Sequence, residues 1–384
     1  MNPLRACIAA VALAVAGCGG DPDPSSIWTE PELSITPPPN FPAQRVPADD
    51  PWSVDKARLG RWLFYDRRLS GNETTSCGSC HRQSLAFTDG RATALGSTGE
   101  HHFRASMSLA NAGYSSALTW ASTIQRRLPQ QALLPMFGER PVELGLAGME
   151  SVMLDRLRAD ARYRDLFPRA FPGQAEPFTV DNVTRAIGAF ERSLLSANSP
   201  FDRYQRGDAS AMSASALRGF ALFNSETLEC FHCHGGFNLT DSVVHARSAF
   251  DETAFHNTGL YNVDGRGAYP AGDTGLHMQT GVAEDMGRFR APTLRNIAVT
   301  APYMHDGSIA TLDGVIDHYS AGGRTITSGP NAGVGSANPF KSGFVRGFAL
   351  TNDERADLIA FLESLTDPVF LTDPRYADPF GNER

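Results

Sequence analysis

Apolar residues recur every three or four positions in several stretches of the chain, and this spacing predicts amphipathic helices. Residues 56–69 show the pattern first, and residues 182–195 carry a longer run of it. Two further helices are expected at 214–223 and at 355–365, the latter beginning after Thr351 as its N-cap. The chain is therefore expected to be mostly α-helical.

Composition indicates a globular protein, and the net charge speaks against one class of partner. The 384 residues are 41 % hydrophobic and 20 % charged, which is the balance of an ordinary globular protein of about two or three domains. The formal net charge of −8 argues against a nucleic-acid partner, because phosphate binding needs a basic surface. Residues 235–285 are rich in glycine and lack a clear period, which predicts extensive loops.

The first residues are typical of an export signal rather than of a folded element. Residues 1–17 combine a positive Arg5 with an apolar stretch that is too short to span a bilayer. Small residues directly before Cys18 resemble a lipoprotein cleavage site, which predicts a lipid on this cysteine; the alternative is an ordinary signal peptide cleaved nearby. Residues 18–45, rich in Pro, Asp and Ser, are expected to form a tether. We therefore expect a periplasmic lipoprotein anchored to a membrane.

The six cysteines carry most of the chemical information in the sequence. Two lie in the signal or just after it, and the other four form two pairs with two intervening residues, each followed directly by histidine. These residues are Cys77, Cys80 and His81, and Cys230, Cys233 and His234. This is the attachment motif of c-type haem. One helical turn places both thiols on one face, where they reach the porphyrin while the histidine turns toward the iron.

Two other kinds of site also use paired cysteines. Four cysteines can bind zinc, and a thioredoxin-like protein carries one such pair in a βαβ unit. The histidine after both pairs favours haem over zinc, and no βαβ pattern supports a thioredoxin. Because a predicted helix precedes each motif, we expect two cytochrome c-like haem domains with extensive loops, residues 46–205 and residues 206–384.

Three further stretches, together with the two haem motifs in order, resemble a known family. They are Leu-Gly-Arg-Trp-Leu-Phe-Tyr-Asp at 59–66, Phe-Arg-Ala-Pro-Thr-Leu-Arg-Asn at 289–296 and Ala-Pro-Tyr-Met-His-Asp-Gly at 301–307. The chain resembles the bacterial di-haem cytochrome c peroxidase and MauG superfamily over nearly all of 52–367. It is most similar to the methanobactin-associated, MbnH-like di-haem enzymes. The resemblance implies a peroxide-reactive haem in the N-terminal domain and an electron-transfer haem in the C-terminal domain.

The resemblance also implies roles for individual residues. His81 and His234 would be the proximal haem ligands, and Trp120 falls where the family places a tryptophan between the haems. Gln131 and Glu143 fall where the family keeps a glutamine and a glutamate over the reactive haem. An acid there takes a proton from one peroxide oxygen and delivers it to the other. Without the resemblance, the tryptophan is a core aromatic residue and the polar pair lies in a solvated loop.

The distal ligand of the second haem distinguishes the subclasses of the family, because it is methionine in the peroxidases and tyrosine in MauG. Counted from His305 of the Tyr-x-His motif, the ligand position falls on Tyr319, so the chain resembles MauG there. A phenolate stabilises high oxidation states of iron, whereas a thioether favours the reduced state. His318, Met304 and Met286 are the alternative ligands.

The family also binds calcium between the haems, through backbone carbonyls at the positions of Thr300 and Pro302 and through an asparagine side chain. Ala105 stands at the asparagine position and lacks the oxygen that a hard cation needs, which speaks against calcium here. His101 and His102 are expected to lie in a solvated loop, with reversible ligation of the first haem as the alternative.

MauG uses a surface tryptophan before its second haem motif to oxidise its partner protein. The matching position here is Leu228, so electrons would leave by another route. Trp28, Trp52 and Trp62 are the candidates for that exit.

The resemblance implies a peroxide-dependent di-haem oxidoreductase. Hydrogen peroxide would form high-valent iron at the first haem, and the oxidised pair would convert tryptophan to kynurenine on a periplasmic, copper-binding partner protein. The first alternative is a cytochrome c peroxidase that reduces peroxide with electrons from a small redox protein. The second is a non-catalytic electron-transfer cytochrome, against which Glu143 and Gln131 speak.

Overall fold

The computed structural model describes residues 32–251 and 253–381, whose regular elements are helices apart from four strands of two residues each. Residues 1–17 and Cys18, the expected signal and lipid site, lie outside the described residues. The α-helices of the first half are α1 (Val54–Tyr65), α2 (Cys77–Cys80), α3 (Leu128–Phe137), α4 (Glu150–Ala159), α5 (Ala161–Ala170) and α6 (Val180–Ser193). Those of the second half are α7 (Pro200–Gln205), α8 (Ala214–Phe223), α9 (Cys230–His234), α10 (His277–Thr280), α11 (Leu312–Ser320) and α12 (Asn352–Glu363).

Short elements connect these helices. Antiparallel β1 (Phe255–His256) and β2 (Phe289–Arg290) form one pair, and β3 (Thr325–Ile326) and β4 (Gly333–Val334) form another. The 3₁₀ helices are η2 (Arg67–Leu69), η3 (Gln83–Leu85), η4 (Ala112–Tyr114), η5 (Ala283–Asp285), η6 (Ile297–Val299) and η7 (Gly335–Ala337). Among the helices of the described ranges, none has the length and apolar character of a membrane span.

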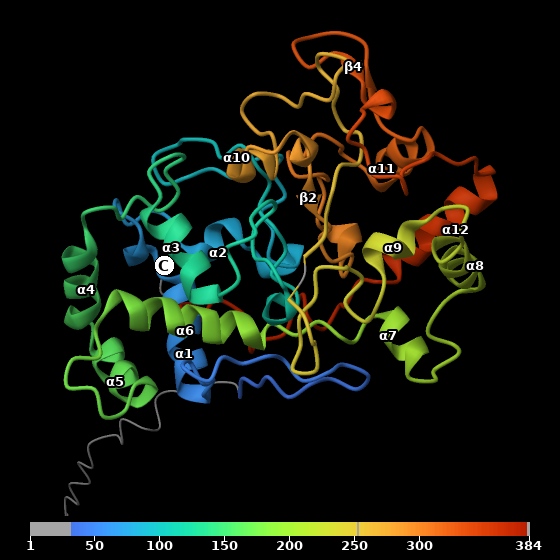
Figure 1. Cartoon of the computed structure of the whole chain (residues 1–384). Helices are drawn as coiled ribbons and strands as arrows, with labels where there is room; N and C mark the ends of the chain where they lie inside the picture. The colour runs from blue at the N-terminus through green and yellow to red at the C-terminus, as the bar shows by residue number, and fades with distance from the viewer. Residues whose placement is uncertain (1–31, 252, 382–384) are drawn as a thin grey trace, which may run out of the picture. The chain divides into compact units, whose positions relative to one another are not determined.

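The first half is built on the packing of α1 against α6 (Figure 1). Gly60 of α1 lies against the backbone of α6, where a Cβ would come within 1.8 Å of the carbonyl oxygen of Ala186. Only glycine permits this approach. Phe64 and Phe190 then meet edge to face, with ring centroids 5.3 Å apart, inside a cluster of fully buried apolar side chains.

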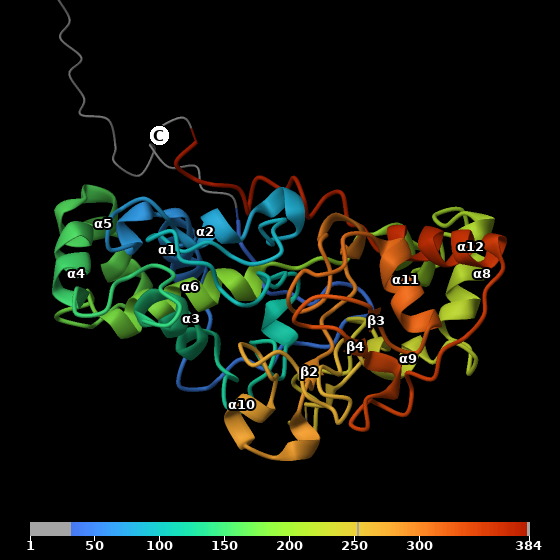
Figure 2. The ribbon, with the colours of Figure 1, turned by 90° about the horizontal axis from the view of Figure 1, so that it is seen from above.

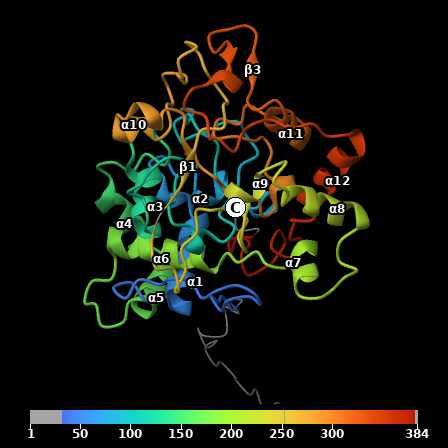
Figure 3. The ribbon, with the colours of Figure 1, turned by 45° about the vertical axis from the view of Figure 1, so that its right-hand side comes forward.

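The second half repeats this construction with α8 and α12, which lie side by side in Figures 1 and 3. A Cβ on Gly219 of α8 would come within 1.9 Å of the carbonyl oxygen of Asp357 on α12. Phe361 is fully buried at the centre of this second cluster and contacts Phe201, Phe220 and Phe223. Each half therefore rests on one close helix pair that a glycine permits.

All four helices predicted from apolar spacing are confirmed. The stretch predicted at 56–69 forms α1 followed by the 3₁₀ turn η2, and the predicted 182–195 forms α6 from Val180 to Ser193. Helix α8 has the predicted bounds. Thr351 caps α12, accepting from the backbone N–H of Glu354 while the carboxylate of Glu354 accepts from the backbone N–H of Thr351.

A third apolar cluster consists mostly of residues between β1 and α11, the yellow-to-orange part of the chain in Figure 2. Its buried members include Leu260, Tyr261, Tyr269 and Phe289, and Trp120 packs against them. Among the described residues of 235–285, β1, α10 and η5 are the only regular elements, which is consistent with the extensive loops predicted there. These loops carry residues that line the sites described below.

The chain ends depart from the expected boundaries. Part of the segment expected as a tether is packed: Leu33 is buried, and Gln44 donates to the carbonyl of Arg192 at 2.8 Å. At the other end, Phe370 and Tyr376, expected in the second domain, belong to the apolar cluster of the first half. Tyr65 of α1 donates to the carbonyl of Tyr376 at 2.6 Å. The last described residues thus complete the core of the first half.

Candidate functional site

The first haem motif forms the short helix α2, which places its two thiols one turn apart. Burial raises the pKa of Cys80 to about 11, so this thiol is protonated at neutral pH. The Nδ1–H of His81 donates to the carbonyl of Phe87 at 2.7 Å. That hydrogen bond fixes the ring and leaves Nε2 available as a ligand. Burial lowers the pKa of His81, which keeps the imidazole in the neutral form that binds iron.

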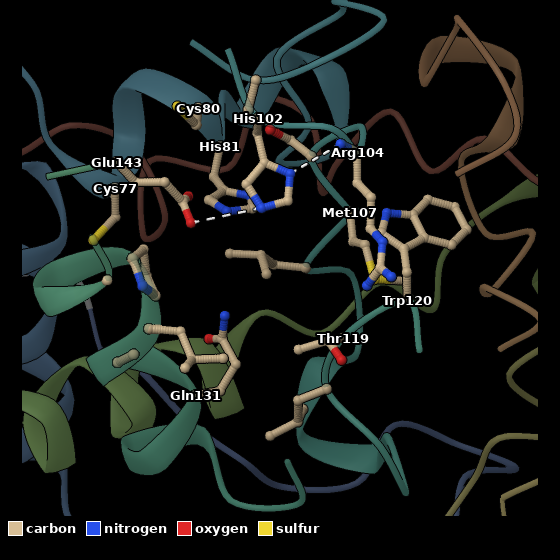
Figure 4. Close-up of a pocket in the computed structure, with 18 of the residues that line it drawn as sticks. Cys77, Cys80, His81, His102, Arg104, Met107, Thr119, Trp120, Gln131 and Glu143 are labelled. Atoms are coloured by element: carbon tan, nitrogen blue, oxygen red, sulfur yellow. Dashed lines mark hydrogen bonds and ion pairs between the residues drawn. The ribbon is translucent and has the colours of Figure 1, made fainter. Parts of the chain in front are cut away.

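A cavity of about 440 Å³ adjoins this motif. Its lining includes both thiols and the imidazole of the motif, and it also includes Gln131 from α3, Glu143 from the loop after α3, and Trp120 (Figure 4). The structure thus gathers the residues assigned to the first haem around one space. Thiols, an imidazole and apolar walls such as Leu128 and Ile187 are the donor set and lining that a covalently attached haem requires.

Acid–base groups gather on one side of the first cavity. Burial raises the pKa of Glu143 to about 7, so at neutral pH this carboxyl group both accepts and donates a proton. Nε2 of His102 lies 4.0 Å from Oε1 of Glu143 (Figure 4). Nδ1 of His102 accepts from the backbone N–H of Arg104 at 2.9 Å. His102 therefore faces the cavity, whereas His101 is exposed as expected of a solvated loop.

The second haem motif forms α9 at the edge of a separate cavity of about 200 Å³. Burial raises the pKa of the Cys230 thiol to about 12. Nδ1 of His234 is buried and makes no hydrogen bond with any residue that the structure describes. A buried imidazole beside two unpaired thiols fits a haem here too. The pairs of thiols line different cavities, which excludes the alternative of one zinc ion shared by all four.

Tyr319 from α11 lines the second cavity, and of the alternative ligands only Met304 does so as well. His318 is 3 % exposed, and within residues 32–251 and 253–381 its two ring nitrogens have no hydrogen-bond partners, but it is not part of the lining. Met286 is also absent from the lining. Burial raises the pKa of Tyr319, so its phenol keeps the proton at neutral pH unless a cation binds the oxygen.

Trp120 and Arg290 line both cavities and so form the protein bridge between them. The indole Nε1–H of Trp120 donates to the carbonyl of Ala105 at 2.8 Å, and its own carbonyl accepts from the backbone N–H of Arg290 at 2.7 Å. Ala105 also donates its backbone N–H to the carbonyl of His305 at 2.7 Å. The alanine at the family's calcium position thus offers no side-chain oxygen, and both of its backbone groups bind protein.

The tryptophans proposed as electron exits differ in their surroundings. Trp62 is 3 % exposed, stacked beneath the guanidinium of Arg162 at 3.8 Å, so it does not present a ring at the surface. Trp52 is half-buried and donates to the carbonyl of Ala189 at 2.9 Å. Leu228, at the position of MauG's surface tryptophan, is buried in the second apolar cluster. Trp28 lies outside the described residues.

Sequence reasoning assigned no role to several residues of the two sites. Glu191 lines the first cavity from α6 and is 5 % exposed, and its Oε2 atom has no hydrogen-bond partner in the described part of the chain. Burial raises its pKa to about 8. His256 lines the second cavity, and its Nε2 atom lies 2.6 Å from Oδ2 of Asp241. Arg290 lies within the stretch at 289–296 that resembles the family, and nothing else in the sequence pointed to this residue.

Comparison with known proteins agrees with these features. A family model described as di-haem cytochrome c peroxidase matches residues 54–210. The cytochrome-c peroxidase IdrP1 of Denitromonas iodatirespirans is 35 % identical over 353 residues, covering 87 % of this chain and 88 % of that protein. The methylamine utilization protein MauG of Methylorubrum extorquens is 33 % identical over 333 residues, covering 86 % and 83 %.

Among solved structures, a MauG-like protein associated with microbial copper homeostasis matches with a TM-score of 0.88 and 50 % identity, covering 89 % of this chain and 98 % of that one. Relatives named as peroxidases and as MauG show a peroxide-dependent oxidoreductase with two haems, which takes hydrogen peroxide as oxidant and acts with a partner protein or redox partner. Since these relatives span most of the chain, the protein belongs to the di-haem cytochrome c peroxidase and MauG family.

Proposed function

We propose that this enzyme uses hydrogen peroxide to oxidise a residue on a partner protein, converting a tryptophan to kynurenine on a periplasmic, copper-binding partner. The observation that carries the proposal is the tyrosine at the second cavity, joined to the first cavity by Trp120. The 50 % identical structure associated with copper homeostasis supports the choice of partner.

The proposal assigns one covalent haem to each cavity, because each cavity is lined by two thiols and an imidazole. Cys77 and Cys80 would form the thioethers of the first haem and His81 its proximal ligand; Cys230, Cys233 and His234 would serve the second, with Tyr319 as its distal ligand. Haem supplies one-electron oxidation chemistry at iron and a store for oxidising equivalents. A haem count of two per purified chain tests the assignment, and Cys230→Ala with Cys233→Ala should lower the count to one.

Glu143 and Gln131 would handle the proton of peroxide in the first cavity. The carboxylate of Glu143 would accept a proton from one oxygen of peroxide and return it to the other oxygen, which leaves as the O–O bond breaks. The amide of Gln131, which lines the same cavity, would hold peroxide by hydrogen bonds. Trp120 would conduct electrons between the two cavities because this residue lines both.

Addition of one equivalent of peroxide to the fully oxidised protein tests the proposal. We expect a long-lived absorbance change without prior reduction, because the phenolate of Tyr319 stabilises the oxidised state. Tyr319→Phe should shorten its lifetime at least about tenfold and alter the spectrum of the second haem. Tyr303→Phe is the matched control, since Tyr303 lines the same cavity but donates to the carbonyl of Ile297. Unaltered second-haem spectra in Tyr319→Phe would contradict the assignment.

A second candidate is a peroxidase that takes electrons from a small redox protein. Met304 also lines the second cavity, and a relative at 35 % identity is named a cytochrome-c peroxidase. This candidate predicts activity only after one-electron reduction and loss of that activity in Met304→Leu. Peroxide reactivity of the fully oxidised wild type, unchanged in Met304→Leu, would decide for the first proposal.

We further propose two haem domains, residues 46–205 and 206–384, with the last part of the chain returning to the first domain. The separate apolar clusters around α1 with α6 and around α8 with α12 support this division.

The protein is also proposed to be a periplasmic lipoprotein with lipid on Cys18. Cys18→Ser should move the protein from the membrane fraction to the soluble periplasmic fraction with its haems retained. If the variant stays with the membranes, the lipid proposal fails.

A further inference from the structure

A group of potential metal ligands lies at the start of α9, apart from the haem thiols. Glu226, Glu229 and His232 each offer one ligand atom, and the three atoms lie within 4.8 Å of one another. Among the described residues one other such group occurs, formed by Cys233, Asp241 and His256. That group includes a haem-attachment thiol, so haem attachment would leave it with two ligands. The first group keeps all three in the haem-loaded protein.

Glu229 gives an independent sign that a ligand belongs here. Its side chain is only 9 % exposed, yet its Oε2 atom makes no hydrogen bond to another described residue. That atom lies 2.6 Å from Nε2 of His232, in a geometry that does not form a hydrogen bond. Arg346 approaches only the other oxygen, Oε1, at 3.8 Å, and its side chain is 70 % exposed. A buried carboxylate oxygen that lies this close to an imidazole nitrogen without a hydrogen bond is costly, and a cation bound by both atoms would satisfy it.

The imidazole of His232 is held in place by aromatic rings. Phe344 stacks on it with centroids 4.3 Å apart and planes 19° apart, and the ring of Phe231 lies 4.1 Å away. This packing directs Nε2 toward the carboxylates of Glu229 and Glu226, at 2.6 and 3.8 Å. The ligand atoms therefore converge before any metal binds, which lowers the entropy cost of binding.

We propose that Glu226, Glu229 and His232 form a binding site for a divalent transition-metal ion at the edge of the second haem site. One imidazole and two carboxylates suit Cu²⁺ and Zn²⁺ rather than soft, thiolate-preferring ions, and the general order of metal affinities places Cu²⁺ above Zn²⁺. Glu226 is 81 % exposed, so the ion has an open path from solvent. Glu229 also lines the second cavity, which places the ion beside the second haem.

Calorimetric titration of the metal-free, haem-loaded protein with Cu²⁺, and separately with Zn²⁺, tests the proposal. We expect one tight equivalent of either ion, with Cu²⁺ the tighter. Glu229→Gln and His232→Asn should each weaken binding about tenfold or more. His277→Asn is the matched control, because His277 belongs to neither ligand group among the described residues, and it should bind as wild type does. The Cu²⁺ electron paramagnetic resonance spectrum should lose its nitrogen coupling in His232→Asn alone.

His232 lies between the two cysteines of its motif and is not itself a haem-attachment residue, so each variant should retain two haems per chain. Measured haem content therefore shows that each variant is folded. Absence of a stoichiometric equivalent in the wild type overturns the proposal. Equal affinity in wild type, Glu229→Gln and His232→Asn overturns it as well. A comparable loss in His277→Asn would show adventitious binding to surface histidines and would have the same consequence.

Discussion

At the scale of single residues, burial sets the chemistry of the first cavity. Glu143 lies among apolar walls that disfavour its charged form, and its pKa rises to about 7. A carboxyl group of ordinary pKa would be fully ionised at neutral pH and a poor proton donor. The raised value suits this side chain to both of the proton transfers that we propose for peroxide cleavage.

Glu143→Gln should slow the reaction of the first haem with peroxide by about 10²- to 10⁴-fold. In the wild type the rate should rise with pH through about 7, because only the carboxylate accepts the proton of peroxide. The variant should lose this dependence. Stopped-flow absorbance across the neutral pH range measures both effects. Glu139→Gln, an exposed neighbour in the same loop, should behave as wild type does. A full pH dependence in Glu143→Gln would contradict the assignment.

Glu191 should make stability depend on pH in the opposite direction from an ion-paired carboxylate. Its pKa is about 8 in the folded protein, against about 4.3 for an unperturbed glutamate. Between these values the folded state keeps a proton that the unfolded state has lost, so stability falls as pH rises from about 4.3 to about 8.

Glu191→Gln removes that titration and should raise the melting temperature at alkaline pH, by an amount equivalent to about 1 to 3 kcal/mol, with little change at acid pH. Calorimetric melting of the haem-loaded protein at several pH values measures the difference. Glu150→Gln, at an exposed position, serves as control. Parallel melting curves for wild type and Glu191→Gln at all pH values would exclude this role.

The two haem motifs could be recognised in the sequence because they are local patterns with fixed spacing. The other site residues were assigned from the positions that match the family. Glu191 was not, since nothing in an amphipathic helix shows that one of its carboxylates is buried against a cavity. His102 was expected in solvent, and the structure places it beside Glu143 because the backbone N–H of Arg104 binds its Nδ1 atom. Such contacts depend on tertiary packing, which apolar spacing does not encode.

At the scale of elements, each half of the molecule is stabilised by one pair of helices that a glycine allows to pack closely. The period of apolar residues predicted these helices, because one face of each is buried. It did not predict which helices pair, since that depends on close backbone approach at Gly60 and Gly219. Nor did it predict that Phe370 completes the first core, because a short loop segment carries no period.

Gly60→Ala should destabilise the protein, because its Cβ would lie 1.8 Å from a carbonyl oxygen of the partner helix. We expect a loss of about 1 to 3 kcal/mol and a lower melting temperature by circular dichroism, and the same for Gly219→Ala. Gly272→Ala is the control, because a Cβ there meets no atom within 4 Å. If all three variants melt alike, close helix packing is not what these glycines provide.

At the scale of the whole molecule, the proposed function requires the two cavities to act together. The apolar clusters of the two halves are separate, and Trp120 lies in the loop region that connects them. Its indole Nε1–H donates to the carbonyl of Ala105 and its own carbonyl accepts from Arg290, so both ends of this residue are held in place. A fixed aromatic ring of low oxidation potential is suited to relay an electron between two haems.

Trp120→Phe should therefore separate the two haems functionally while leaving each in place. Peroxide should still react at the first haem, because Glu143 and Gln131 are unchanged, but the spectrum of the second haem should no longer respond in the same phase. Oxidation of the partner protein should fall by at least about tenfold, since phenylalanine is much harder to oxidise than indole. Trp52→Phe, whose ring lines neither cavity, is the control and should retain the coupled response. A coupled response in Trp120→Phe would mean that electrons cross by another route, for which Arg290 and the backbone between the cavities are the remaining protein path.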